Sequence, residues 1–299
     1  MKTIRIECKV ITPMFLTGAD GKTPELRPPS IKGAMRFWWR AMHGYLPLEK
    51  LKKKEAEIFG GSGEEEGRSS FSIKINEIEI LNEGTYQPLP HHTNNWCNSS
   101  KGCIFKRGKC TKSHKSACIS VNSRFETEIL LNDPLLECTV KNLFILTSVL
   151  GGLGKRARRG FGSFKILKIN NTHFSNDNSL KSICNLLNSV SNIFKNTNNI
   201  SLNTEVHPTA NYPYIKEIRI GKEDDSYEGL LNTIGQASHD HNDNSLGFAR
   251  GRLASPIYVS LIEDSQGYKP IITTLNTAFE NSNWSVNENK QNDFKGEIL

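Results

Sequence analysis

Residues 139–169 read TVKNLFILTSVLGGLGKRARRGFGSFKILKI, and this stretch decides the fold. Its first part places apolar residues at helical spacing and predicts a helix that ends at the glycine pair 151–152. A basic loop follows, and residues 164–169 predict a strand. The stretch is therefore a helix, a glycine-rich basic loop and a strand.

The same alternation of strands and helices extends in both directions. Residues 3–10 alternate perfectly between apolar and polar and predict a half-buried strand. Ser30 resembles a helix N-cap before apolar residues at helical spacing. Further elements are a strand beginning at Phe71, strands near 125–131, 212–220 and 257–262, and helices near 180–194 and 227–237. The tail beyond Phe279 is polar and predicts frayed chain.

Strand–helix–strand pieces in both halves predict an α+β fold with split βαβ, ferredoxin-like units. We expect an N-terminal domain at 1–170 that carries the basic loop, and a C-terminal domain at 171–299. Residues 84–124 have few large apolar residues and predict an insertion between strands of the first domain.

Composition excludes several classes of protein. The 299 residues are 36% hydrophobic and contain seven cysteines, which rules out collagen-like, disulfide-dense and wholly disordered chains. The chain shows no secretory signal and no apolar stretch of the ~20 residues that span a bilayer. We therefore expect a cytoplasmic protein with no membrane partner.

The net charge of +7 is unevenly distributed. Three windows, 26–40, 101–118 and 151–168, contain no acidic residue and together carry sixteen positive charges. The rest of the chain therefore has a net charge of −9. Concentrated basic patches favour a polyanionic partner such as a nucleic acid.

The loop 152–162 is the strongest nucleic-acid candidate. Glycines let backbone amides approach phosphates, and arginines offer planar donors to phosphate oxygens or stack on bases. The alternative is an exposed, idle turn, and the order of a phosphate-binding P-loop is absent. The predicted RNA contacts are Gly152, Gly154, Lys155, Arg156, Arg158, Arg159, Gly160, Phe161 and Gly162.

A second basic patch follows Ser30. Lys32, Arg36 and Arg40 lie four residues apart and predict one stripe along a helix, flanked by Trp39. A stripe of one sign beside an aromatic residue is typical of RNA contact, and a solvated helix face is the alternative.

The third patch overlaps a group of metal-ligand residues in the insertion. Thiolates and imidazoles suit tetrahedral zinc, and a small lysine-rich insertion needs a metal to stay folded. The alternatives are free surface thiols or a disulfide pair, and His91 and His92 are outside candidates for the site. The predicted zinc donors are Cys97, Cys103, Cys110, His114 and Cys118, which offer five donors for four positions.

Signals for catalysis are weak. His43 and Asp20 are the two candidates for a general base that would attack RNA, and each also suits an ordinary helix or turn. The run His239-Asp240-His241 could form a metal site, but a solvated loop is the stronger interpretation of this polar sequence. We therefore expect no enzyme activity.

Three segments resemble the Cmr-one family of RAMP proteins, within the Cas-seven-like RAMP superfamily. The long run Glu25 to Ala41, ELRPPSIKGAMRFWWRA, resembles the opening of that family, and Gly251 to Ile257 is similar to its C-terminal segment. The loop 152–162 resembles the glycine-rich signature shared by RAMP proteins.

The resemblance implies tandem RRM-like, ferredoxin-like folds in a non-catalytic RNA-binding subunit of a type III CRISPR ribonucleoprotein, with other RAMP and Cas subunits as partners. It implies contact with guide RNA near its 3′ end, with target RNA, or with both, in antiviral defence. Two alternatives stay open: a RAMP endoribonuclease that processes CRISPR precursor RNA, and a zinc-stabilised module for protein assembly.

Overall fold

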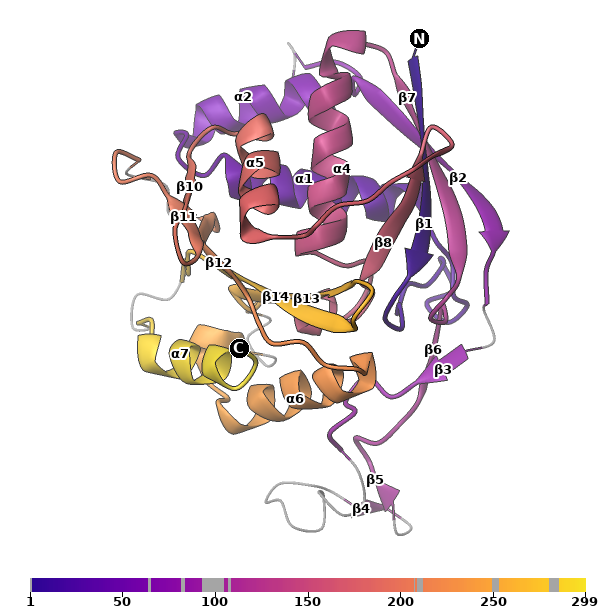
Figure 1. The fold of residues 1–299 in the computed structure, drawn as a ribbon, viewed down its shortest axis with the longest axis vertical. Helices are drawn as coiled ribbons and strands as arrows, with labels where there is room; N and C mark the ends of the chain where they lie inside the picture. The colour runs from indigo at the N-terminus through magenta and orange to yellow at the C-terminus, as the bar shows by residue number, and fades with distance from the viewer. Residues whose placement is uncertain are drawn as a thin grey trace.

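Two antiparallel sheets and two layers of helices make up the molecule in a computed structural model (Figure 1). The structure describes residues 2–63, 66–81, 84–92, 105–106, 109–206, 208, 212–248, 253–279 and 285–299. None of the helices in these ranges is both long and apolar enough to cross a membrane.

The first sheet has the strand order β2-β7-β1-β8-β9, and α1 and α4 pack on one of its faces. Its connectivity, β1-α1-β2-β7-α4-β8, is the βαββαβ pattern of a ferredoxin-like unit. Its elements are β1 (Lys2–Val10), α1 (Pro28–Met42), α2 (Leu48–Phe59), β2 (Phe71–Glu79), β7 (Arg124–Leu131), α4 (Glu137–Leu150), β8 (Phe164–Ile169) and β9 (Thr172–His173).

The second sheet has the order β10-β11-β12-β14-β13 and follows the same logic with one change. The edge position beside β12 is filled by β11, which precedes β12 in the chain instead of closing the unit. Its elements are α5 (Leu180–Val190), β10 (Phe194–Asn196), β11 (Ile200–Leu202), β12 (Ile215–Ile220), α6 (Tyr227–Asp240), β13 (Ile257–Glu263), β14 (Tyr268–Leu275) and α7 (Glu288–Gly296).

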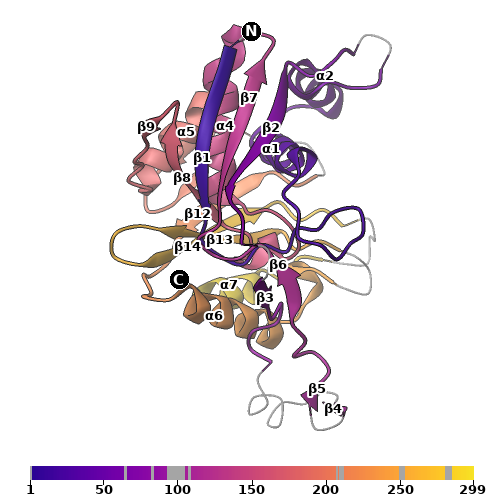
Figure 2. The same cartoon turned by 90° about the vertical axis from the view of Figure 1, so that its right-hand side faces the viewer.

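The helices α1, α4 and α5 lie between the two sheets, and α6 and α7 cover the far face of the second sheet (Figure 2). One hydrophobic cluster therefore joins residues of both sheets, such as Ile4 and Ile218, across the central helices. A second cluster, with Val259 and Phe294, fills the space under α6 and α7. The α+β fold is confirmed, while the domain division at residue 170 stays a prediction.

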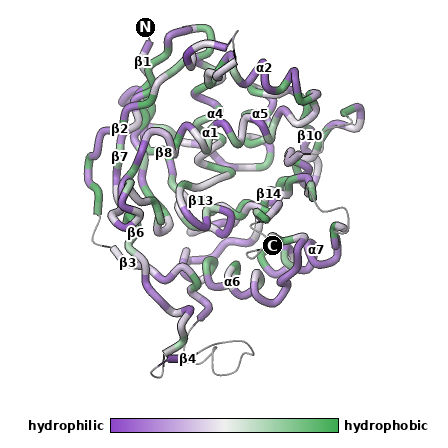
Figure 3. Tube along the Cα trace, turned by 180° about the vertical axis from the view of Figure 1, so that it is seen from behind, coloured by the Kyte–Doolittle hydropathy of each residue, from purple (hydrophilic) through white to green (hydrophobic). Residues whose placement is uncertain are grey.

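The predicted insertion leaves the body beside α6 as two small hairpins (Figures 1 and 2). Strand β3 (Gly84–Tyr86) pairs with β6 (Ser116–Cys118), and β4 (Phe105–Lys106) pairs with β5 (Lys109–Cys110). Figure 3 shows that its described part beyond β3 and β6 is mainly hydrophilic, so it contributes little to the core.

Two local predictions were wrong. Helix α1 begins at Pro28 with Arg27 as its N-cap, so Ser30 lies inside the helix; two prolines at the start supply the fixed φ that a first turn accepts. The tail beyond residue 284 is not frayed. It forms α7, capped by Asn287, and buries Phe294 and Ile298 completely or nearly so.

Candidate nucleic-acid interface

The Gly-rich loop, residues 152–162, is fastened to both halves of the molecule. The Lys155 amide donates to Phe15 O at 2.9 Å and the Gly162 amide to Pro13 O at 3.0 Å, both in the β1–α1 loop, residues 11–27. The Gly160 amide donates to Val259 O of β13 at 2.7 Å. The loop thus joins the first sheet to the second.

The glycines of this loop are required by contacts within the protein. Gly154 has φ +92°, and a Cβ there would collide with Phe15 O. Gly162 has φ +68°, and its Cβ would collide with Leu153 O. Both backbone conformations and both close approaches exclude a side chain. Gly152 is similarly enclosed by Phe161 O, so contacts within the protein account for these three glycines without a bound phosphate.

Arg158 and Arg159 point into the molecule. Arg159 donates to Ile257 O and Leu246 O, each at 3.0 Å, and its guanidinium lies 5.0 Å from the centre of the Phe294 ring. Burial, with the neighbouring charges of Arg156 and Arg158, lowers the pKa of Arg159 to about 9, so the group stays charged at neutral pH. Arg158 donates to Ser255 O and lies over the Tyr258 ring. Arg158 and Arg159 were predicted to contact RNA, but in this structure they form contacts within the protein.

Phe161 is also a core residue. It is 1% exposed, and its ring contacts Phe15 at 5.2 Å and Tyr86 at 6.0 Å between centroids. A base cannot reach its faces in this conformation. Phe161, which the sequence analysis predicted as an RNA contact, therefore packs in the protein interior.

Lys155 is exposed, and Arg156 beside it is half-buried. They line a pocket of ≈ 280 Å³ between the Gly-rich loop, the β1–α1 loop and the insertion. Lys22 joins them, and the nine lining residues, all described, include these three cations and no acid. The lining residues are Phe15, Thr17, Gly21, Lys22, Pro88, Ser116, Ala117, Lys155 and Arg156. We call this the basic pocket.

Arg156 is held in place by local backbone geometry. Its φ is +63°, a left-handed conformation that turns the chain sharply before the short helix Ala157–Arg159. Its guanidinium lies 5.9 Å from the centre of the Phe161 ring, and burial lowers its pKa.

The sequence did not reveal Lys22 as part of the site. Lys22 belongs to the β1–α1 loop, 133 residues before Lys155 in the chain.

The basic stripe of α1 is present, but it faces the neighbouring helix. Arg36 and Arg40 both contact Glu55 of α2, whose side chain is only 6% exposed; the Arg40 Nη2 to Glu55 Oε1 distance is 3.0 Å. Lys32 donates to Phe71 O at 3.2 Å. The stripe therefore fixes α1 to α2 and β2, which differs from the RNA-facing role predicted for it.

Trp39 is buried rather than beside an open surface. It is 2% exposed and stacks on His43, with ring centroids 4.0 Å apart and an interplanar angle of 19°. The His43 Nδ1 lies 2.8 Å from Trp39 O, and burial lowers the pKa of His43 to about 4. Asp20 is exposed and accepts hydrogen bonds from the Lys22 and Thr23 amides, which closes its own turn. Both catalytic candidates thus have structural partners.

Ion pairs cover the outer face of the first sheet. Glu7 pairs with Lys168 at 2.9 Å and with Arg124, and Glu263 pairs with Lys9 at 2.8 Å and with Lys165. The charges of Lys165 and Lys168, counted in the basic window of the sequence, are therefore compensated within the protein. The outer face offers balanced charge rather than a positive surface.

The structure divides the predicted zinc donors. Cys97 and Cys103 lie outside the described residues. Cys118 is buried in a cluster with Phe15, Phe161 and Leu231, whereas His114 is exposed. Cys110 is buried, with its Sγ 3.8 Å from His92 Nδ1.

Three histidines meet where the sequence favoured a solvated loop. His91, His92 and His239 have ligand atoms within 4.8 Å of one another. His239 is in the last turn of α6, and the run that contains it is therefore helical up to Asp240. His241 lies at the helix end, 2.5 Å from Glu297. Sequence spacing could not reveal this group, because about 150 residues separate its two parts.

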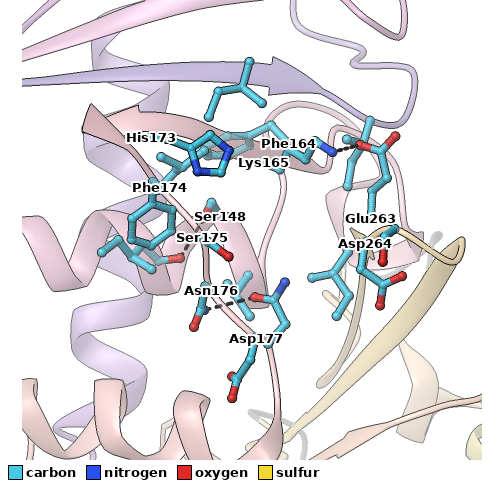
Figure 4. Close-up of a pocket in the computed structure, with 18 residues that line it drawn as sticks. Ser148, Phe164, Lys165, His173, Phe174, Ser175, Asn176, Asp177, Glu263 and Asp264 are labelled. Atoms are coloured by element: carbon cyan, nitrogen blue, oxygen red, sulfur yellow. Dashed lines mark hydrogen bonds and ion pairs between the residues drawn. The ribbon is translucent and has the colours of Figure 1, made fainter. Parts of the chain in front are cut away.

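Another pocket, of ≈ 540 Å³, lies between β8, the segment after β9 and the β13–β14 turn (Figure 4). Its carboxylates are engaged in structure. Asp177 accepts from the Ser179 amide at 3.0 Å ahead of α5, Asp264 accepts from the Gln266 amide at 2.8 Å in the hairpin, and Glu263 faces Lys165. This pocket lacks the unmixed positive charge of the basic pocket.

Sequence comparison relates the chain to known proteins. The sequence model of the RAMP superfamily matches residues 7–165, which include the β1–α1 loop and the Gly-rich loop. A Pyrococcus furiosus protein named CRISPR system Cmr subunit Cmr1-2 is 29% identical over 177 residues, 54% of this chain and 92% of that protein. Cmr subunit Cmr1-1 of the same organism is 32% identical over 151 residues, 48% of this chain but only 41% of the relative.

Solved structures share the fold over the whole chain. The crystal structure of apo Cmr1 from Pyrococcus furiosus has a TM-score of 0.57 at 19% identity, covering 100% of this chain and 97% of the other. A chain in a cryo-EM structure of the type III-B Cmr-beta complex bound to cognate target RNA has a TM-score of 0.59 at 12% identity, with 99% of both chains covered. At these identities the likeness concerns the fold alone.

Proposed function

Since the chain belongs to the RAMP superfamily, we propose that it is a non-catalytic, RNA-binding subunit of a type III-B CRISPR effector complex. The observation that carries the proposal is the basic pocket, whose cationic side chains all lie in the region matched by the family. The names of its two Pyrococcus furiosus relatives, both Cmr subunits, support the type of complex.

The basic pocket suits an RNA backbone. Lys22 and Lys155 are exposed point charges on two different loops, and Arg156 adds a planar donor that its packing holds in place. Cations that converge from separate loops can contact successive phosphates of a single strand. Because backbone contacts carry no base information, binding at this pocket is tolerant of sequence.

The proposed RNA is the guide RNA near its 3′ end, the target RNA, or both, and the proposed protein partners are other RAMP and Cas subunits. The fold likeness to a chain of a complex bound to target RNA is in keeping with this proposal. Sequencing the RNA that co-purifies with the tagged chain from its host distinguishes the two. Guide RNA gives reads from CRISPR spacers, and target RNA gives complementary reads.

Two other functions make different predictions. An endoribonuclease would release a discrete product from CRISPR repeat RNA and lose it in His43→Ala. We expect no product, because His43 is 7% exposed and stacked on Trp39, so its ring is not presented to a substrate. An assembly module would co-purify with protein but without RNA after low-salt isolation.

The test of the proposed site is the salt dependence of RNA affinity. We expect Lys22→Ala/Lys155→Ala to weaken binding of unrelated single-stranded RNAs by a similar factor. The slope of log affinity against log salt should become shallower by about 0.7 for each phosphate that the variant no longer neutralises. Fluorescence anisotropy at several salt concentrations measures both quantities.

The matched control removes the same charge elsewhere. Lys181 and Lys216 are exposed residues of α5 and β12. Lys181→Ala/Lys216→Ala should leave most of the affinity and slope unchanged. Equal effects of the two double variants, or no effect of the first, would overturn the assignment of the basic pocket.

A further inference from the structure

Three histidines from distant parts of the chain converge beside the insertion. His91 and His92 follow β3, and His239 belongs to the last turn of α6. One ligand nitrogen from each lies within 4.8 Å of the other two. His91 and His92 are 7% and 2% exposed, so the group is largely screened from water.

A thiol of the same insertion lies next to one of these histidines. The Cys110 Sγ is 3.8 Å from His92 Nδ1, and the cysteine is 4% exposed. In a tetrahedral zinc site, bond lengths of about 2.0–2.1 Å to nitrogen and about 2.3 Å to sulfur place nitrogens about 3.3 Å apart and nitrogen and sulfur about 3.6 Å apart. The three nitrogens, within 4.8 Å of one another, would have to move closer together by side-chain rotation, and the Cys110–His92 separation is already near the expected value.

Helix α6 is shaped to admit the group. A Cβ on Gly235 would lie 2.5 Å from His91 Nδ1, so only glycine lets this imidazole rest against the helix. The ring centroids of His91 and His239 are 5.9 Å apart, and those of His92 and His239 are 6.1 Å apart. The insertion therefore meets α6 through imidazoles, at a place where the helix has no side chain of its own.

We propose that His91, His92 and His239, with Cys110, hold a Zn²⁺ ion that fastens the insertion to α6. The ion is structural, since all four positions of a tetrahedral site are then filled by protein. The insertion has little apolar area to hold it against the body, and the metal supplies this connection. Of the donors predicted from the sequence, this proposal keeps Cys110 and leaves out His114 and Cys118, while Cys97 and Cys103 lie outside the described residues.

The test measures metal directly and does not depend on RNA binding. Protein purified without chelator should contain close to one equivalent of zinc by elemental analysis. His239→Gln should lower zinc affinity by more than the ~10–100-fold typical of changes outside the first ligand shell, and should lose the metal on dialysis. His239 is only partly buried near a helix end, so the variant is expected to fold; far-UV circular dichroism checks this.

Two further variants separate this site from its competitors. His114 is an exposed histidine of the insertion and is not part of the proposed site. The His114→Gln variant should therefore retain its zinc. Gly235→Ala keeps all four donors but displaces His91, and should weaken zinc binding while leaving α6 helical. Loss of metal in His114→Gln, full retention in His239→Gln, or metal-free wild-type protein would each overturn the proposal.

Cobalt substitution reports on the thiol. Co²⁺ added to metal-free protein should give the visible bands of tetrahedral coordination and a near-ultraviolet sulfur-to-cobalt transition. Cys110→Ser should remove the second signal. A cobalt spectrum without tetrahedral bands, or with a sulfur signal that survives in Cys110→Ser, would contradict the proposed donor set.

Discussion

Arg159 shows how one side chain can hold two sheets together. Its fork of N–H donors reaches Ile257 O, Leu246 O and Ser255 Oγ at 3.0–3.1 Å, and its plane lies against Phe294 of α7. All of these partners come from the second sheet or the elements that cover it. Lys155, four residues earlier in the same loop, instead faces the basic pocket.

Arg159→Ala is therefore expected to destabilise the fold, by about 3 kcal/mol or more, because three buried acceptors lose their donor. Lys155→Ala should change the free energy of unfolding by less than ~0.5 kcal/mol and should weaken RNA binding. Urea denaturation and RNA binding measured on both variants check this division. Equal stabilities of the two variants would show that the arginine contacts contribute little.

The stripe of α1 illustrates what a single element can and cannot reveal. Helical spacing correctly indicated that Lys32, Arg36 and Arg40 share one side. It could not indicate what that side meets, since the partner Glu55 comes from α2, a helix that the sequence pattern did not single out. The buried Glu55 carboxylate neutralises part of the charge of Arg36 and Arg40, whose side chains are 40% and 53% exposed.

Glu55→Gln should destabilise the protein by about 1–3 kcal/mol, because two guanidinium groups lose a charged, partly desolvated acceptor. Glu57→Gln, an exposed change on the same helix, is the control and should stay within ~0.5 kcal/mol. Thermal and urea unfolding measure both. If Glu55→Gln left stability unchanged and raised RNA affinity, the stripe would be an RNA contact after all.

Regular elements were predictable where their own residues carry the pattern. The strand at 3–10, the helix at 180 and the strand at 257 all appear within a few residues of the expected place. Elements whose apolar residues are sparse were not: α7 has only Phe294 to bury within a polar sequence, and its position depends on Arg159 and the second sheet. The basic pocket and the histidine group could not be predicted for a different reason, since each is assembled from segments far apart in the sequence.

At the scale of the whole molecule, the central helices serve both sheets. Trp38 and Trp39 of α1 and Ile218 of β12 belong to one hydrophobic cluster. The Gly-rich loop adds hydrogen bonds from the first sheet to β13. The two ferredoxin-like halves therefore share a core instead of meeting at a separable interface.

A cavity in the second sheet should consequently unfold the first as well. Ile272→Ala, at a 1% exposed position of β14, is expected to cost about 2–5 kcal/mol. Because both sheets share a core, tryptophan fluorescence and far-UV circular dichroism should shift together in urea. The fluorescence is measured with Trp96 and Trp284 replaced by Phe, so that Trp38 and Trp39 give the signal. If part of the circular dichroism were lost while this fluorescence kept its original transition, the halves would be independent.

The Gly-rich loop places Lys155 five residues from Gly160, whose amide is bonded to β13. Anion binding at Lys155 and the hydrogen bond at Gly160 therefore both depend on the same loop conformation. By thermodynamic linkage, a ligand that binds only this conformation stabilises the hydrogen-bonded connection between the two sheets. The affinity of this short segment for its ligand would then be higher when the two sheets are joined than when they are apart.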